Sequence, residues 1–226
     1  MPSERVGSGP IRQYEANEPA LRIGMTGQAV KNLQSMLNGL GIRDDEGNSL
    51  AVTGRFDEKT RQAVMNFQRF LNDQGYRDDN GLALTVDGVH GNSTRAAEYR
   101  LERAHYDIHV KILNNLRELG SVAWQDTIPT GVLERKDDAA PSEQVRALQR
   151  VLNTLGFELP VNGIYGPLTE KAVKSLQVLL NGENTPRENS EAYAGSLKVD
   201  GRFGPATRDA LMRYVEKLVD ENPFIQ

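Results

Sequence analysis

Four eight-residue blocks in this sequence match position for position, and this repeat constrains the fold more than any other feature. Each block runs small polar residue, Gly, any residue, ring side chain, Gly or Asp, two variable residues and Thr. The blocks are residues 53–60, 87–94, 162–169 and 200–207. Three residues after each Thr stands an alanine, and seven residues after it stands a large apolar residue. This spacing predicts a turn that leads into a helix with an apolar stripe.

Two positions of the block compete for the start of that helix. Asp or Asn followed by Gly predicts the turn, because Gly reaches positive φ without steric cost. In the third and fourth blocks Pro stands two residues before the Thr, so either the Thr or the second Gly can be the N-cap. The ring is interpreted most simply as a core residue that ties the turn to its helix.

A second motif precedes the first and third blocks. The pattern Val-x-x-Leu-Gln-x-x-Leu-x-x-Leu-Gly covers residues 30–41 and recurs at residues 145–156, an offset of 115. Apolar spacing of three, with Gly after the last Leu, predicts an amphipathic helix with a Gly C-cap. Ser142 is a plausible N-cap for the second copy.

The chain is therefore predicted to be a duplicated helical unit. Each copy holds three helices and two turn blocks, and the helical stripe after residue 104 can simply extend the third helix of the first copy. We expect an all-α protein with two tandem three-helix bundles joined by a helical linker. The expected parts are an N-terminal arm at 1–21, bundles at 22–103 and 141–220, a helix plus linker at 104–140 and a tail at 221–226.

These motifs carry a family resemblance. The second copy runs from Val145 to Gln177 as helix, Asn-Gly-x-Tyr-Gly-x-x-Thr block and Ala-Val-x-x-Leu-Gln helix, and Val-Asp-Gly-x-x-Gly-x-x-Thr follows. This combination resembles the peptidoglycan-binding domain of bacterial and phage cell-wall hydrolases, in two tandem copies. The first copy departs at Thr53, usually Asp, and at Asp57, usually Gly. The resemblance implies three-helix bundles that hold cell-wall glycopeptide and usually accompany a separate catalytic domain.

Peptidoglycan offers amide, hydroxyl and carboxylate groups, which Arg side chains, Asn and Asp side chains and turn amides can bind. A ring in the turn could also stack on a sugar. The candidate binding residues are Arg55, Asp87, Asn162, Tyr165, Asp200, Arg202 and Phe203.

An alternative role competes for several of these residues. Asp87, Asn162 and Asp200 can stabilise their own turns, and Phe56, Tyr165 and Phe203 can belong to the core. The residue after each turn Gly is then the better candidate for a ligand contact. These residues are Arg55, Val89, Ile164 and Arg202.

Motifs for catalysis and metal binding are few. There are no cysteines, so thiolate zinc sites and cysteine nucleophiles are excluded. His90 replaces the ring of the second block and is interpreted as a turn or core residue. His105 and His109 are spaced i, i+4, but Glu102 is the nearest third ligand and no HExxH is present, so a packed or solvated helix face is favoured. We expect no catalytic residue, no metal and no cofactor.

Charge and hydropathy exclude two classes of partner. The formal net charge is −4, without the basic stripe of a duplex-binding protein, so nucleic acid is not expected. No apolar run approaches 18 residues, so no membrane span is expected. Peptidoglycan is the expected partner, together with a catalytic domain or a secretion or phage protein.

Three functions follow from these observations. The first is non-catalytic binding of peptidoglycan that targets an associated or missing hydrolytic activity to the wall. The second is a cell-wall hydrolase, such as a phage endolysin or an injected antibacterial effector, with a cryptic or absent catalytic domain. The third is a protein–protein interaction module of a phage or secretion machine. Residues 1–21 lack the apolar segment of a signal peptide. We therefore expect delivery to the wall by lysis, by an injection system or with a leader that this sequence lacks.

Overall fold

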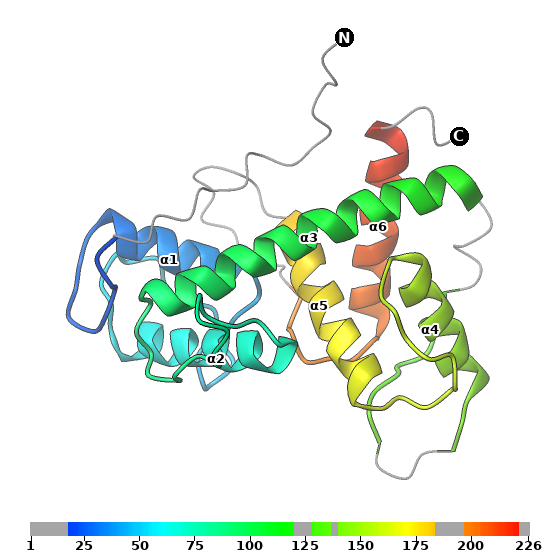
Figure 1. Ribbon diagram of the computed structural model, residues 1–226, viewed down its shortest axis with the longest axis horizontal. Helices are drawn as coiled ribbons and strands as arrows, with labels where there is room; N and C mark the ends of the chain where they lie inside the picture. The colour runs from blue at the N-terminus through cyan, green and yellow to red at the C-terminus, as the bar shows by residue number, and fades with distance from the viewer. Residues whose placement is uncertain (1–17, 120–127, 137–139, 184–196, 222–226) are drawn as a thin grey trace. The chain divides into compact units, whose positions relative to one another are not determined.

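Helices account for the regular structure of the residues that the structure describes. The computed structural model describes residues 18–119, 128–136, 140–183 and 197–221 (Figure 1). Within these ranges there is no strand, and extended segments meet only in isolated antiparallel bridges. The helices are α1 (Gln28–Gly39), α2 (Glu58–Gln74), α3 (Asn92–Leu119), α4 (Glu143–Thr154), α5 (Pro167–Glu183) and α6 (Pro205–Glu221). The predicted all-α class is confirmed, whereas the predicted arm at 1–21 and tail at 221–226 lie almost wholly outside the described residues.

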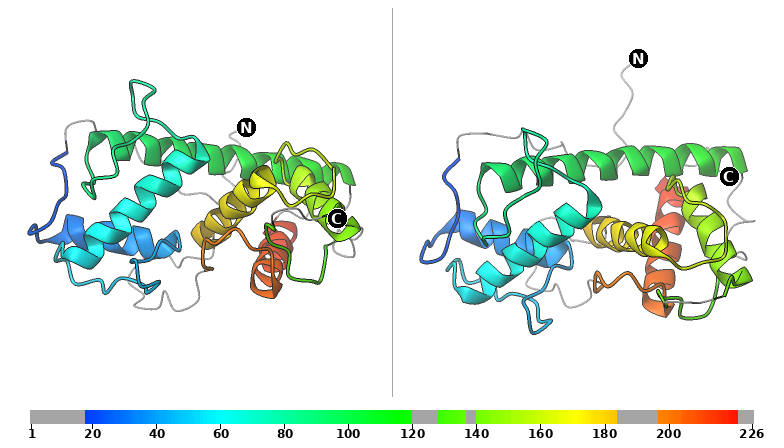
Figure 2. Two further views of the ribbon diagram at one scale, coloured as in Figure 1. Left: turned by 90° about the horizontal axis from the view of Figure 1, so that it is seen from below. Right: turned by 60° about the horizontal axis from the view of Figure 1, so that its bottom comes forward.

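The described residues divide into two compact units. Residues 18–103 form the first unit, which contains α1, α2 and the start of α3. The described residues of 104–183 and 199–221 form the second, which contains the rest of α3 with α4, α5 and α6. Helix α3 is unbroken over 28 residues (Figures 1 and 2). The first unit thus holds α1, α2 and the start of α3, and the second holds α4, α5 and α6 together with the rest of α3. Two helical units fit two tandem bundles.

The apolar stripe predicted from the repeat forms the core of both units. The alanines three residues after the blocks are at most 5% exposed: Ala63, Ala97, Ala172 and Ala210. The large apolar residues four positions further on are at most 1% exposed: Phe67, Leu101, Leu176 and Tyr214. Burying such side chains stabilises the fold by roughly 1.5–3 kcal/mol each. The predicted stripe is confirmed.

The second Gly of the block, or its Asp counterpart, starts each helix. The residue directly before α2, α3, α5 and α6 is Asp57, Gly91, Gly166 and Gly204, respectively. Its carbonyl accepts the first intrahelical hydrogen bond, at 2.9–3.0 Å. The Thr lies three positions inside the helix and is not the cap. Pro in the third and fourth blocks fills the first helical position, where a missing N–H costs nothing.

Glycines also end three of the helices. Gly41, Gly75 and Gly156 follow α1, α2 and α4 with φ of 75°, 85° and 92°. The N–H of the next residue returns to the helix, as in the 2.9 Å bond from Ile42 to the carbonyl of Leu37. This is the Schellman arrangement, in which a left-handed Gly satisfies the last carbonyls. The predicted Gly ends of α1 and α4 are therefore confirmed.

Residues that precede Pro141 pack into the second unit. Ile112 of α3 is 1% exposed, and His109 Nδ1 lies 2.7 Å from the Tyr214 hydroxyl oxygen. Leu133 exchanges both main-chain hydrogen bonds with Phe203, each at 2.8 Å. The core of the second unit therefore draws on the segment that the sequence favoured as linker.

Two acidic loops of the first unit fold alike. Asp44 Oδ1 accepts the N–H groups of residues 46 and 48 at 3.0 and 2.7 Å, and Asp78 Oδ1 accepts those of residues 80 and 82 at 2.9 and 2.8 Å. Each Asp thus closes its own turn.

We expect Ile112→Ala to lower the free energy of unfolding by about 2–5 kcal/mol, because it removes buried apolar volume from the second unit. Val110, on the same helix, is 37% exposed. Val110→Ala is the matched control, with an expected change under about 1 kcal/mol. Urea denaturation followed by circular dichroism measures both, and equal effects would contradict the packing described here.

Candidate binding site

A left-handed glycine lies at the centre of each turn block. The φ values of Gly54, Gly88, Gly163 and Gly201 are 72°, 75°, 78° and 74°. A Cβ atom on Gly163 would lie 2.9 Å from the carbonyl oxygen of Ser142 at the start of α4. Any side chain would collide there, so glycine alone lets the turn lie against the helix.

A buried glutamine from the preceding helix holds the turn. In the fourth block Gln177 Oε1 accepts the N–H of Gly201 at 2.9 Å. The two N–H groups of Gln177 Nε2 are shared among three acceptors. These are Asp200 Oδ1, the Arg202 carbonyl and Thr207 Oγ1, at 3.0, 3.1 and 3.3 Å from Nε2. Because Gln177 is only 2% exposed, these partners replace water. We call this set of bonds the glutamine clamp.

The glutamine clamp occurs in all four blocks. Gln34, Gln68, Gln149 and Gln177 each accept the turn Gly N–H at 2.9 Å and donate to the next carbonyl at 3.0–3.1 Å. In the first block Thr53 Oγ1 stands 3.5 Å from Gln34 Nε2, where the other blocks place an Asp or Asn oxygen at 2.9–3.0 Å. The departure of the first block therefore weakens one bond and keeps the clamp.

The Asp and Asn candidates belong to this framework. Two hydrogen bonds reach the Oδ1 atom of Asp87, Asn162 and Asp200. One comes from Nε2 of the clamp glutamine, and the other comes from the main-chain N–H two residues further on, at 2.9 Å in every case. Asp87 and Asn162 are exposed and Asp200 is half-buried. The structure thus supports the interpretation that they stabilise their turns.

The ring candidates lie in the core. Phe56, Tyr165 and Phe203 are 1%, 3% and 0% exposed. Tyr165 donates its hydroxyl to the Gly201 carbonyl at 2.7 Å, and burial raises the pKa of Tyr165, so the hydroxyl stays protonated. These rings tie the turns to the core and have no exposed face on which a sugar could stack. The alternative role given by the sequence is the one observed for Tyr165 and Phe203.

The residue after each turn Gly lies at an outer corner of the block. Arg55, Ile164 and Arg202 are exposed and Val89 is half-buried. The Arg202 side chain is 54% exposed, and its Nε lies 2.6 Å from Glu134 Oε2. Among the described residues, Arg55 forms no ion pair. Both guanidinium groups therefore lie at a corner where an outside molecule can reach them.

An extended segment before the first helix of each unit pairs with that unit's second block. Leu21 exchanges main-chain hydrogen bonds with His90 at 3.1 and 2.9 Å, and Leu133 does so with Phe203 at 2.8 and 2.8 Å. We call residues 18–26 the first strap and residues 128–136 the second strap. Each strap places side chains beside the corner of the second block.

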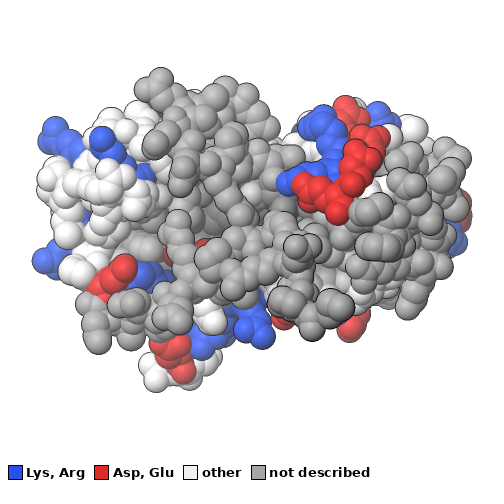
Figure 3. All heavy atoms as spheres, turned by 90° about the horizontal axis from the view of Figure 1, so that it is seen from above, with Lys and Arg blue, Asp and Glu red and all other residues white. Residues whose placement is uncertain are grey.

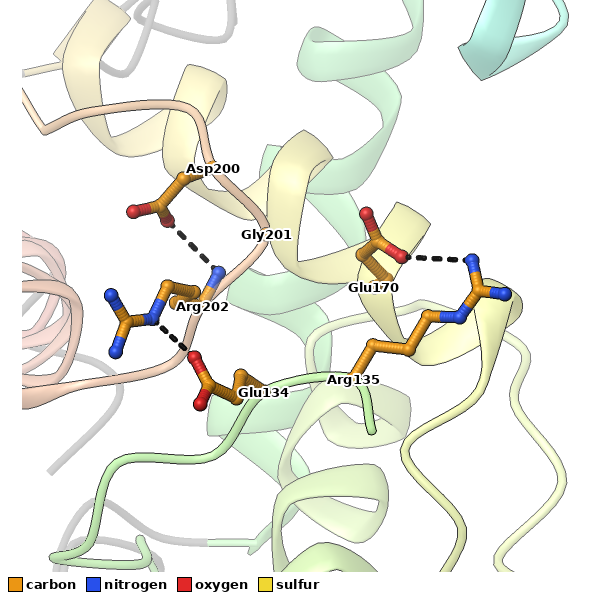
Figure 4. A pocket seen from close by; sticks show the side chains of 6 residues that line it. All are labelled: Glu134, Arg135, Glu170, Asp200, Gly201 and Arg202. Carbon is orange, nitrogen blue, oxygen red and sulfur yellow. Dashed lines mark hydrogen bonds and ion pairs between the residues drawn. The ribbon is translucent and has the colours of Figure 1, made fainter. Parts of the chain in front are cut away.

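One pocket borders the fourth block, in the second unit, and another borders the second block, in the first unit. One, of about 450 Å³, lies between the second strap, α5 and the fourth block (Figure 4). Its lining residues are Glu134, Arg135, Glu170, Asp200, Gly201 and Arg202. The other, of about 480 Å³, lies beside the second block and includes Asp78, Leu82, Asp87 and Ser93 among its lining residues. Both volumes suit small ligands or single residues of a polymer.

Sequence reasoning missed the structural role of the glutamines and of the asparagines that follow them. Asn38, Asn72 and Asn153 stand four residues after their glutamine and exchange hydrogen bonds of 2.7–2.8 Å with the main chain of the following loop. The signal was present, because Leu or Phe followed by Gln-x-x-Leu-Asn occurs at 33–38, 67–72, 148–153 and 176–181. Alignment of these segments would have found both residues.

The histidines make internal contacts. His90 Nε2 lies 2.7 Å from Glu98 Oε2, and His109 contacts Tyr214 as described above. Burial lowers the pKa of His105 to about 4, so this ring is neutral at neutral pH. In the described part of the chain, no cluster of three or more His, Cys, Asp or Glu side chains could hold a metal ion.

Charges of both signs are interspersed on the described surface, as the face in Figure 3 illustrates. Several exposed ion pairs account for this, for example Arg61 with Glu58 at 2.6 Å and Arg150 with Glu143 at 2.8 Å. No helix in the described ranges is long and apolar enough to cross a membrane. A ligand would therefore meet individual charged side chains at the blocks rather than a large surface of one sign.

Comparison with known protein families matches the putative peptidoglycan binding domain at residues 26–97 and 141–182. The two segments fall in separate units and together cover half of the chain. The chain therefore belongs to the peptidoglycan-binding domain family, as its motifs indicated. Neither the curated proteins nor the solved structures yield a match. Family membership supports peptidoglycan as the partner and the bacterial cell wall as the place of action.

We expect Gln149→Leu to lower the free energy of unfolding by about 2–4 kcal/mol, because it leaves the N–H of Gly163 and the carbonyl of Ile164 buried without their clamp partner. Gln144 is exposed on the same helix, and Gln144→Leu is the control, with an expected change within about 0.5 kcal/mol. Chemical denaturation measures both. A Gln149→Leu variant as stable as the control would refute the importance of the clamp.

Proposed function

We propose that this chain binds peptidoglycan without cutting it and brings an associated hydrolytic activity to the cell wall. The observation that carries the proposal is the family match over both units, combined with an exposed arginine at a turn corner in each. Arg55 and Arg202 occupy the same position of their blocks, directly after the left-handed Gly. Both units thus present the same cationic group on the same framework.

The chemistry of the corner suits the stem peptides of the wall. Peptidoglycan carries carboxylates and amides, and a guanidinium group binds a carboxylate through two parallel N–H donors. Arg55 and Arg202 are therefore the proposed ligand contacts. Asp87, Asn162 and Asp200 each hold the turn of their own block, and Tyr165 and Phe203 lie in the core. In this proposal these five residues are framework, and Asp200 is the one among them that accepts the N–H of a proposed contact, Arg202.

The use of two units has a physical advantage on a polymeric ligand. When one unit is bound, the second meets nearby wall at a high effective concentration, which raises overall affinity without any new contact. Exposed contacts that are individually weak then suffice. The hydrolytic activity that this binding concentrates at the wall would come from another domain or from a partner protein.

Sedimentation with insoluble peptidoglycan tests the binding. We expect the intact chain to sediment, and Arg55→Ala or Arg202→Ala to weaken binding by about 1–2 kcal/mol, roughly five- to thirtyfold, through loss of a charge-assisted hydrogen bond. Arg150 is an exposed arginine of α4 outside the blocks, so Arg150→Ala is the control and should change binding less than about twofold.

Two outcomes would count against this proposal. If the intact chain stays in the supernatant, it does not bind the wall. If the double variant of Arg55 and Arg202 sediments as well as the unaltered chain, the turn corners are not the contacts. Clearing of permeabilised bacteria by the pure chain would contradict the non-catalytic part, because it would reveal hydrolysis without a partner.

A further inference from the structure

The pocket beside the fourth block is lined almost entirely by charged side chains. Five of its six lining residues carry a charge, and the sixth is the turn glycine Gly201 (Figure 4). The acidic residues come from the second strap, α5 and the block: Glu134, Glu170 and Asp200. The basic residues come from the second strap and the block: Arg135 and Arg202. The pocket therefore has charges of both signs on several of its sides.

Four of these five charges form two ion pairs. Arg202 Nε lies 2.6 Å from Glu134 Oε2, and Arg135 Nη1 lies 3.5 Å from Glu170 Oε2. Lys174 Nζ also lies 2.8 Å from Glu170 Oε1. Hydrogen bonding from Lys174, with a smaller contribution from Arg135, holds the pKa of Glu170 below its usual range, so Glu170 is ionised at neutral pH. The two ion pairs flank the pocket (Figure 4).

A ligand of one sign fits this arrangement poorly. A bare anion on Arg202 would leave Glu134 without its cation, and a bare cation on Glu134 would leave Arg202 without its anion. Because exposed ion pairs contribute little to stability, a ligand can exchange with them, provided that it compensates both partners. A ligand that carries both charges does so.

We propose that this pocket binds the zwitterionic end of an amino acid, with its carboxylate on the arginines and its ammonium group on the glutamates. This inference rests on the proposed function, since peptidoglycan stem peptides that contain a diamino dicarboxylic acid present such an end. The pocket volume of about 450 Å³ admits a group of this size.

The main chain that carries the pocket residues is held in place before any ligand arrives. The main-chain pairing of Leu133 with Phe203 positions the adjoining Glu134 and Arg135. Gln177 fixes Gly201, and with it the neighbouring Arg202. Preorganisation of this kind reduces the entropy lost on binding.

The first unit provides an internal comparison, because its strap and second block have the same backbone pairing. On the first strap, Arg22 and Ile23 stand where the second strap has Glu134 and Arg135. Arg61 stands in place of Glu170, and Val89 in place of Arg202. The first unit therefore lacks the two glutamates and two arginines of the pocket, and only the clamp aspartate is shared. Zwitterion binding is therefore a property of the second unit.

The test titrates three small probes into the intact ¹⁵N-labelled chain at pH 7 and follows the amide signal of Gly201. The probes are 2,6-diaminopimelate, pimelate, which lacks the ammonium groups, and 1,5-diaminopentane, which lacks the carboxylates. We expect a saturable shift with 2,6-diaminopimelate at least tenfold tighter than with either other probe. Glu134→Gln and Arg202→Gln should each weaken it at least fivefold, and Arg22→Gln on the first strap should leave it unchanged.

Several results would overturn the inference. Pimelate binding as tightly as 2,6-diaminopimelate would make this a carboxylate site, and equal binding of 1,5-diaminopentane would make it a cation site. Absence of a saturable shift with any probe, or equal loss in Arg22→Gln, would also reject it. The same protein is sedimented with peptidoglycan in parallel. Retained sedimentation without probe binding rejects the zwitterion pocket alone, and loss of both rejects wall binding as well.

Discussion

The buried glutamine of each repeat is the interaction on which both units depend. A left-handed turn glycine directs its N–H toward the helix, where water cannot reach it, and an unsatisfied buried group costs about 1–3 kcal/mol. One glutamine side chain satisfies that N–H, the next carbonyl and a threonine hydroxyl together, as Gln177 does for Gly201 and Thr207. Helix and turn thereby become one rigid piece, and each unit is built from two such pieces closed by a third helix.

This framework separates the atoms that hold the turn from those that can meet a ligand. The clamp binds only the main chain of the residue after the turn glycine and leaves its side chain outside, as at Arg55 and Arg202. The straps add a second layer, because their pairing with His90 and Phe203 brings a further set of side chains to the corner. The two units therefore share a backbone and differ in the charges around it.

The sequence predicted the helices, their Gly ends and the family, because these depend on local spacing. It placed Asp200 and Phe203 among the ligand contacts because their polarity and ring shape suit a glycopeptide, whereas the clamp and the core use them. The glutamines were missed because a polar residue on an amphipathic helix is normally solvated, and their partners lie 13–30 residues away. The pairing of Leu133 with Phe203 joins residues too far apart for any local pattern to reveal.

The corner position has a consequence for how such a chain can diverge. Because the clamp needs nothing of that side chain, substitutions there are nearly neutral for folding and are exposed to selection on recognition alone. The four corners hold Arg, Val, Ile and Arg, whereas the residue before each of them is Gly in every block. A duplicated chain of this kind can explore new ligands at one corner while its other copies preserve the old attachment, so duplication serves it as a source of evolutionary freedom.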